Sequence, residues 1–177
     1  MATTTHVISK VATKIISPIV TPGLTQVDTT ARVPIGTIAW TDMGGMAVYG
    51  QAISDISQYA FCVLYDGFSA EMATTTLAAD GGGSKLLGCP QASIASAQFG
   101  WFMRQGTFVG NVADDAADNV PLFTTATAGY VDDATVSNCL VAGLYLNTTE
   151  GTLCPRSTSP YRALFRSDLT TSLVNVR

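Results

Sequence analysis

The sequence predicts an all-β fold, a barrel or a sandwich in a single domain, with an extended N-terminal arm. From Pro34 onward, short runs of β-branched and aromatic residues alternate with clusters of Gly, Asp and Asn. Their spacing of roughly 8–15 residues is typical of sandwiches and barrels rather than of alternating strands and helices. Residues 1–33 differ, because they are rich in Thr and interrupted by proline. We therefore predict an arm over 1–33 and a β-rich domain over 34–177, with a basic segment over about 151–177.

The local structure of the predicted arm stays open between two forms. Val7, Val11 and Ile15 recur at the spacing of a helical stripe that would end before Pro18. The same residues are β-branched and suit an extended strand equally well. The segment is polar enough to be disordered alone and apolar enough to order on a partner.

Nine segments of the domain have the composition of strands, with turn-forming residues between them. They cover residues 35–40, 46–53, 59–65, 84–89, 100–109, 120–125, 138–146, 161–165 and 173–176. The stretch 71–79 is compatible with a short helix or a strand, and its three consecutive Thr favour the strand.

The segment 59–65 is apolar on both of the faces that a strand would present. Phe61 and Val63 would lie on one face, and Cys62 and Leu64 on the other. Such a strand needs cover on both sides, either from an internal layer of the same chain or from a neighbouring subunit.

Charge is scarce and unevenly distributed. Charged residues make up 12% of the chain, about half the usual share. Residues 1–41 carry a net charge of +2, residues 42–150 of −9 and residues 151–177 of +3. A surface with so little charge is easier to explain if much of it faces other subunits. The basic ends either fold back onto the acidic body or bind an acidic surface on another protein.

The composition argues against several classes of protein. The net charge of −4 leaves no basic face for nucleic acid, and no apolar run is long enough to span a membrane. The only His is His6, so neither a Ser-His-Asp site nor a multi-His metal site is expected. The cysteines have no C-x-x-C spacing, and we expect buried free thiols rather than disulfides or a zinc site; they are Cys62, Cys89, Cys139 and Cys154.

The densest acidic cluster is formed by Asp114, Asp115 and Asp118 with Asn119. Carboxylates suit a hard cation or a glycosidase, but the spacing does not match an EF-hand loop, and a solvated acidic loop is favoured. Trp40 and Trp101 are expected to be core or interface aromatics rather than ligand platforms. We therefore predict a protein that is not an enzyme, with no catalytic residue, metal or cofactor. A carboxylate-based hydrolase remains the enzymatic alternative.

Four patches of the sequence resemble a known family. They are Leu-Gly-Cys-Pro at 87–90, Gln-Phe-Gly-Trp-Phe-Met-Arg-Gln-Gly at 98–106, Pro-Leu-Phe-Thr-Thr-Ala-Thr-Ala-Gly at 121–129 and Leu-Val-Ala-Gly-Leu at 140–144. Their order is similar to that in the capsid decoration, or head cement, proteins of tailed bacteriophages. Upstream, Gly-Thr-Ile at 36–38 and Tyr-Gly-Gln-Ala at 49–52 resemble the opening strands of that family. The match covers about residues 34–146, and Cys89-Pro90 replaces a plainer aliphatic pair.

The resemblance implies a β-barrel-like structural protein of the virion, without catalytic residues. It implies a protein that binds the outer surface of the capsid and cements neighbouring major capsid subunits, so that it stabilises the expanded shell. Its partners would be the major capsid protein and further copies of itself, with a homotrimer favoured over a dimer. We expect synthesis in the host cytoplasm and a final location on the capsid surface.

Two other structural roles stay open: a capsid-forming β-sandwich and a fibre or receptor-binding component. For the contacts with the shell or with other subunits, the cations of the two ends and one aromatic residue are the candidates. They are Lys10, Lys14, Arg32, Trp101, Arg156, Arg162 and Arg166.

Overall fold

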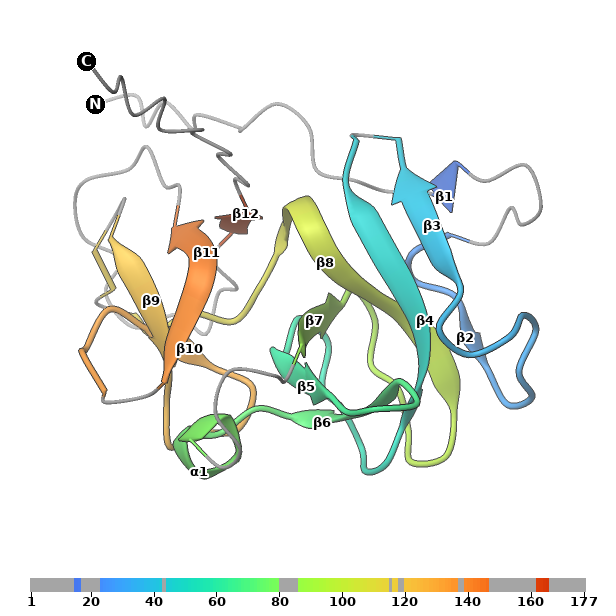
Figure 1. Cartoon of the computed structure of the whole chain (residues 1–177), viewed down its shortest axis with the longest axis horizontal. Coiled ribbons are helices and arrows are strands. Elements are labelled where there is room, and N and C mark those ends of the chain that lie inside the picture. Colours follow the sequence, from blue (N-terminus) through green and yellow to red (C-terminus); the bar gives the residue numbers. More distant parts are fainter. Residues whose placement is uncertain are drawn as a thin grey trace, which may run out of the picture.

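The computed structural model describes residues 15–16, 23–42, 44–79, 86–114, 116–117, 120–136, 139–146 and 162–165 (Figure 1). They form a nearly all-β protein, which confirms the predicted fold class. The strands are β1 (Ile15–Ile16), β2 (Val27–Asp28), β3 (Ile38–Thr41), β4 (Met46–Ala52), β5 (Cys62–Leu64), β6 (Ser69–Met72), β7 (Leu86–Pro90), β8 (Phe99–Val109), β9 (Pro121–Thr124), β10 (Val131–Asp132), β11 (Leu140–Leu146) and β12 (Arg162–Phe165), and helix α1 spans Thr75–Ala79.

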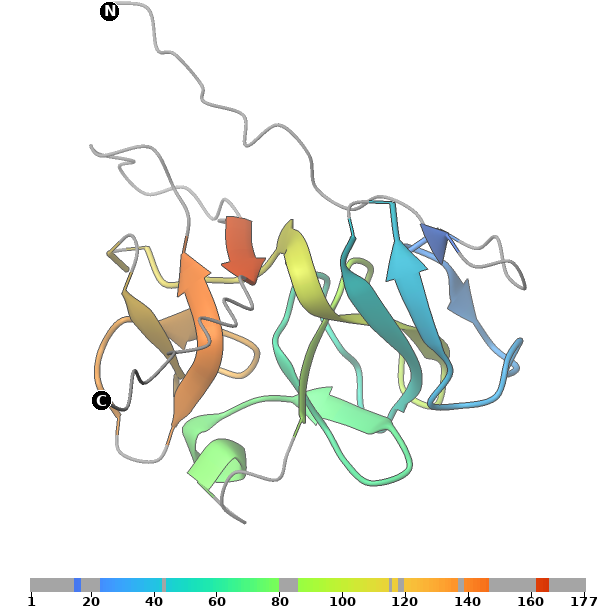
Figure 2. The same ribbon diagram turned by 45° about the horizontal axis from the view of Figure 1, so that its top comes forward.

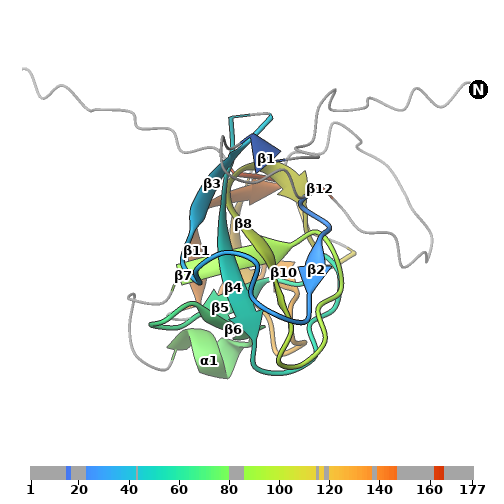
Figure 3. The same ribbon diagram turned by 90° about the vertical axis from the view of Figure 1, so that its right-hand side faces the viewer.

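Five strands close into a barrel. The ring runs β4-β6-β5-β7-β8 and returns to β4, because β4 pairs with both β6 and β8. The β4–β6 contact is parallel and the other four are antiparallel. In Figure 3, β3 and β2 lie on opposite sides of β4, in agreement with the pairing of β3 to β4 and of β2 to β8.

A second sheet continues from the end of β8. Its order is β8-β12-β11-β9-β10, and β12 pairs with residues 106–109 of β8. The barrel and this sheet therefore lie side by side, joined by one strand (Figures 1 and 2). Gly106 stands where β8 passes from one to the other, with φ of +100° and with a Cβ position only 2.6 Å from the Cα of Gly45. That close approach explains a glycine at this point.

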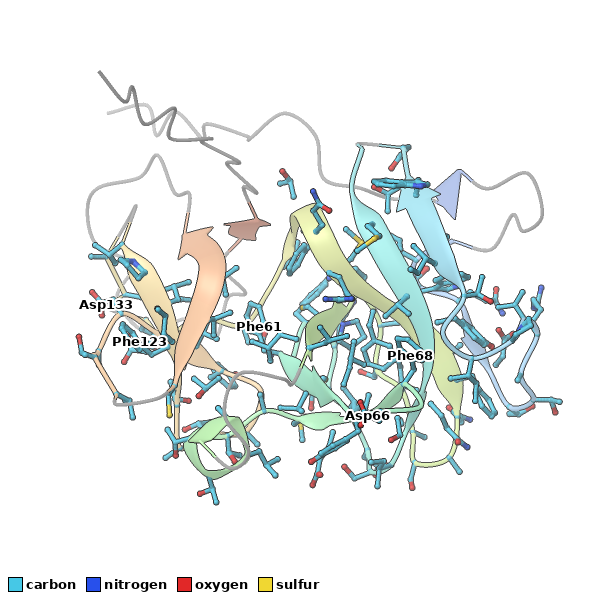
Figure 4. The ribbon with its side chains drawn as sticks, in the orientation of Figure 1. Phe61, Asp66, Phe68, Phe123 and Asp133 are labelled. Carbon is cyan, nitrogen blue, oxygen red and sulfur yellow. The ribbon has the colours of Figure 1, made fainter. Side chains whose placement is uncertain are left out.

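Two apolar clusters hold the fold together. One fills the barrel and includes Val48, Leu64 and Phe102. The other lies outside the barrel and reaches the second sheet. It includes Phe61 (Figure 4), whose ring centroid lies 6.3 Å from that of Phe108. The two faces of β5 thus belong to different clusters, because Cys62 and Leu64 face the barrel interior and Val63 faces the outer cluster. Cover for the two-sided strand comes from within this chain.

Eight of the nine predicted strands correspond to β3, β4, β5, β7, β8, β9, β11 and β12, and the ninth, 173–176, lies outside the described residues. The preference for a strand over 71–79 is wrong for its second half. Strand β6 ends at Met72, and α1 begins after Thr74, whose Oγ1 accepts a hydrogen bond from the N–H of Leu77. Thr74 is therefore an N-cap, a role that favours helix in spite of the β-branched Thr run.

The boundary predicted at residue 33 also needs correction. Residues 23–33 lie on the barrel: Leu24 is in the outer cluster, and β2 pairs with the start of β8. A buried carboxylate fixes this segment, since Asp28 Oδ2 accepts a hydrogen bond of 2.9 Å from the hydroxyl of Tyr49. The body of the protein therefore starts no later than residue 23. Apart from the backbone of β1, residues 1–22 lie outside the described part of the chain.

At Val109, the last residue of β8, the edge next to β7 is hydrogen-bonded by a side chain, and the other edge pairs with β12. The amide Nε2 of Gln91 donates to the carbonyl of Val109 at 2.9 Å, and its Oε1 accepts from the N–H of Val109 at 3.2 Å. Both backbone groups of Val109 are thus satisfied at a point where β7 has already ended.

Candidate interaction surface

Most of the residues predicted as contact sites lie outside the part of the chain that the structure describes. Lys10, Lys14, Arg156 and Arg166 lie outside the described residues. Arg162 opens β12, where its backbone pairs with Val109. The two sites with described side chains, Arg32 and Trp101, both contact Tyr49: the backbone N–H of Arg32 donates to its hydroxyl, and the ring of Trp101 packs against its ring.

Trp101 is a core residue. Its side chain is 1% exposed, and its ring lies 5.1 Å from that of Tyr49. It belongs to the outer apolar cluster, so of the two alternatives for this residue the structure places it in the core of a single chain. Its indole Nε1 is buried and has no hydrogen-bond partner within the described residues.

Arg32 is an exposed cation that is already paired. Its guanidinium lies 3.1 Å from Asp28 Oδ1, and Gln26 donates to the same oxygen at 3.1 Å. Burial raises the pKa of the Tyr49 hydroxyl, the N–H of Arg32 opposes this rise, and the Asp28 carboxylate adds to it. The group as a whole fastens residues 23–33 to the barrel.

The three cysteines with described positions are buried free thiols, as expected, and Cys154 lies outside the described residues. Burial raises the pKa values of the Cys62 and Cys89 thiols, so neither is a reactive thiolate at neutral pH. Of the predicted acidic cluster, only Asp114 is described. Among the described residues, no group of His, Cys, Asp or Glu has the arrangement of a metal site. No helix in that part of the chain has the length and apolar character that a membrane span requires.

A first exposed apolar surface lies on β3. Ile38 and Trp40 alternate with buried Ala39 and Thr41, and their side chains are 55% and 56% exposed. Trp40 pairs with Met46 of β4, so these three side chains share one face of the sheet. We call Ile38, Trp40 and Met46 the β3 patch.

A second exposed surface lies on the outer face of the second sheet. Leu140 of β11, which is 55% exposed, pairs with the half-buried Phe123 of β9, and Phe123 pairs with Asp132 of β10. Tyr130, two residues before Asp132, is 39% exposed. We call Phe123, Tyr130, Asp132 and Leu140 the β9 patch. Figure 4 shows Phe123 at the end of the molecule that carries the second sheet.

Neither patch was singled out from the sequence, although Trp40 was expected in a core or an interface. The alternation 38–41 gives the period of a half-buried strand, but it does not say which face is buried. Here the small residues face inward and the large apolar ones outward, the reverse of the usual pattern. That reversal leaves neighbouring apolar side chains exposed, as at many interaction surfaces.

No protein-family model, curated protein or solved structure matches this chain.

Proposed function

We propose that this protein is a structural component of a tailed-bacteriophage virion. In this role it binds the outer surface of the capsid and connects neighbouring major capsid subunits, and it has no catalytic activity. It is made in the host cytoplasm and ends on the capsid surface, with the major capsid protein and further copies of itself as partners.

The observation that carries the proposal is a closed barrel that leaves two apolar patches exposed. An exposed cluster with Trp, Ile and Met is the composition of a protein–protein interface. The resemblance of residues 34–146 to capsid decoration proteins names the kind of partner. The low share of charge in the whole sequence agrees with extensive contacts to other chains.

Attachment to the shell is assigned to the basic ends of the chain. The net charges of +2 and +3 flank a body of −9, so the ends are complementary to acidic surfaces. Lys10, Lys14, Arg156, Arg162 and Arg166 are the cations concerned. Several such contacts in one oligomer bind the shell with high avidity, even where each single contact is weak.

The test uses expanded heads that lack the protein. The purified chain is added, and its bound copies are counted by imaging of the heads. The temperature at which the heads rupture is measured on the same sample. Binding at many equivalent surface positions with a raised rupture temperature is the expected result. A chain that neither binds nor raises this temperature would refute the proposal.

Two variants separate attachment from folding. Removal of residues 1–22 leaves Leu24 and Asp28 in place, so the body is expected to stay folded while shell binding falls by about tenfold or more. The double change Lys10→Glu and Lys14→Glu is expected to act in the same direction, with Lys85→Glu as a matched control. A copy number equal to that of the shell subunit would instead favour a capsid former, and a few copies at the tail would favour a fibre component.

A further inference from the structure

Near the β3 patch, β8 carries a cation, Arg104, that has no ion-pair partner among the described residues. Arg104 is the additional residue of a bulge in β8, between Met103, which pairs with Ala47, and Gln105, which pairs with Met46. Met46 in turn pairs with Trp40, so the backbones of Arg104 and Trp40 lie two strands apart, about 10 Å. The guanidinium of Arg104 is therefore within reach of a partner that covers the β3 patch.

The environment of Arg104 is unfavourable for an isolated charge. Its Nε is buried without a hydrogen-bond partner, and no acid within the described residues forms an ion pair with it. Partial burial of this guanidinium lowers its pKa. A half-buried cation is normally stabilised by a carboxylate, because desolvation without a partner is costly.

The β9 patch offers the complementary chemistry. Leu140, Phe123 and Tyr130 supply apolar area, and Asp132 places a carboxylate on the same face of the sheet. Asp133 and Asp114 lie in the adjoining loops and make this end of the molecule acidic. The β3 patch combines apolar area with a cation, and the β9 patch combines apolar area with an anion.

The two patches lie toward opposite ends of the long axis, with β3 and the β9–β11 strands far apart in both views (Figures 1 and 2). They cannot meet within one chain. We propose that the β3 patch of one copy docks on the β9 patch of a second copy, with Trp40 against Leu140 and Phe123, and with Arg104 near Asp132. Such a contact is head-to-tail. It produces a closed ring when the same rotation, repeated from copy to copy, returns to the first copy.

This inference concerns contacts between copies and is tested on the purified protein alone. It deepens the proposed function, which already names further copies of this chain as partners. Association of the protein alone and its binding to heads are measured separately, so the failure of one is distinguishable from the failure of the other. The first measurement is sedimentation of the full chain over a range of concentrations. We expect an oligomer whose mass falls to that of a single chain in Trp40→Glu and in Leu140→Glu.

The matched control is Ile53→Glu, because Ile53 is 50% exposed and belongs to neither patch. It is expected to keep the oligomeric mass of the original chain. All three variants change exposed side chains, so their melting curves are expected to show a folded body. A chain that is monomeric at every concentration, or a control that dissociates like the other two, would overturn the proposal.

Mixing distinguishes a head-to-tail contact from a symmetric one. Trp40→Glu keeps an intact β9 patch, and Leu140→Glu keeps an intact β3 patch, so the mixture is expected to form a complex with one copy of each. If the β3 patch instead paired with itself, Leu140→Glu alone would remain associated and the mixture would form no new complex. That result would overturn the assignment.

A charge exchange tests the ion pair. Asp132→Arg alone is expected to weaken association at least about tenfold, because two cations then face each other. The double change Arg104→Asp with Asp132→Arg restores opposite charges across every contact and is expected to restore association. Equal weakening by the single and the double change, with both proteins folded, would place Arg104 outside the interface.

Discussion

The barrel and the second sheet differ in how much of their surface one chain can cover. Strands β4, β5 and β8 contribute apolar residues to a cluster inside the barrel and to another outside it. The sheet of β9–β11 buries Leu122 and Val141 on its inner face and leaves Leu140 exposed on its outer face. Two-sided strands therefore do not by themselves require a partner subunit in this protein. The exposed patches at its two ends are where we propose that other chains bind.

The largest expected effect contrasts the two tryptophans. Trp101→Ala removes a fully buried ring from the outer cluster and is expected to lower the free energy of unfolding by about 3–5 kcal/mol. Trp40→Ala removes an exposed ring and is expected to change the stability of the monomer by no more than about 0.5 kcal/mol. Chemical denaturation at low protein concentration measures both. Equal losses would mean that the β3 patch is part of the core.

The next effect concerns the strand that joins the two regions. Gly106→Ala places a Cβ against the backbone of Gly45 at positive φ and is expected to cost about 2–3 kcal/mol. Gly44 also has positive φ, but a Cβ there meets no atom within 4 Å. Gly44→Ala is therefore expected to cost only about 1 kcal/mol, the penalty of the backbone conformation. Thermal denaturation of the two variants compares them, and a smaller loss at Gly106 would contradict the close approach.

The hydrogen bond that fastens residues 23–33 is expected to contribute about as much to the free energy of unfolding as Gly106 does. Tyr49→Phe removes the hydroxyl that donates to the buried Asp28 and is expected to cost about 1.5–3 kcal/mol. Its pH dependence has a defined sign. Because the folded pKa of Tyr49 lies above its usual value of 10.0, the folded state favours the protonated hydroxyl. This stabilisation is complete below about pH 10 and is lost as the pH rises through the folded pKa.

Denaturation from pH 9 to pH 12 tests this prediction. The original protein is expected to lose stability in that range more steeply than Tyr49→Phe does. Parallel curves for the two proteins would show that ionisation of Tyr49 is not linked to unfolding.

The smallest expected effect on stability comes from Arg32, which also contacts Asp28 and Tyr49. Arg32→Gln removes a surface ion pair whose cation is 55% exposed, and it is expected to cost about 0.2–1 kcal/mol. The loss should shrink in high salt, because exposed charges are screened. A loss as large as that of Tyr49→Phe, measured by denaturation in both salts, would mean that Arg32 also packs against the barrel.

The sequence predicted the barrel well because its strands are marked by apolar runs and by turn residues. It predicted less well where a single side chain decides the local structure. Thr74 turns a Thr-rich stretch into the start of a helix, and Asp28 binds a segment that looks like an arm to the barrel. Both effects depend on partners that are distant in the sequence or on cap geometry, which composition does not reveal.

The β3 patch shows the same limit at the level of the surface. A strand with period-two alternation has two possible orientations, and only the fold decides which face of residues 38–41 is buried. Trp101 and Trp40 occupy comparable sequence contexts, yet one lies in the core and the other in solvent. The uneven charge predicted contacts at the basic ends of the chain and gave no information on this strand.

The longest strand pairing of the barrel, between β4 and β8, has a consequence for how the protein folds. Met46 pairs with the distant Gln105, on the far side of β5, β6 and β7 in the sequence. No local hairpin can start this pairing, so the loss of chain entropy precedes most of the gain from contacts. Folds of this kind reach the native state in milliseconds to seconds rather than microseconds. On the ribosome, the barrel cannot close before the whole of β8 has emerged.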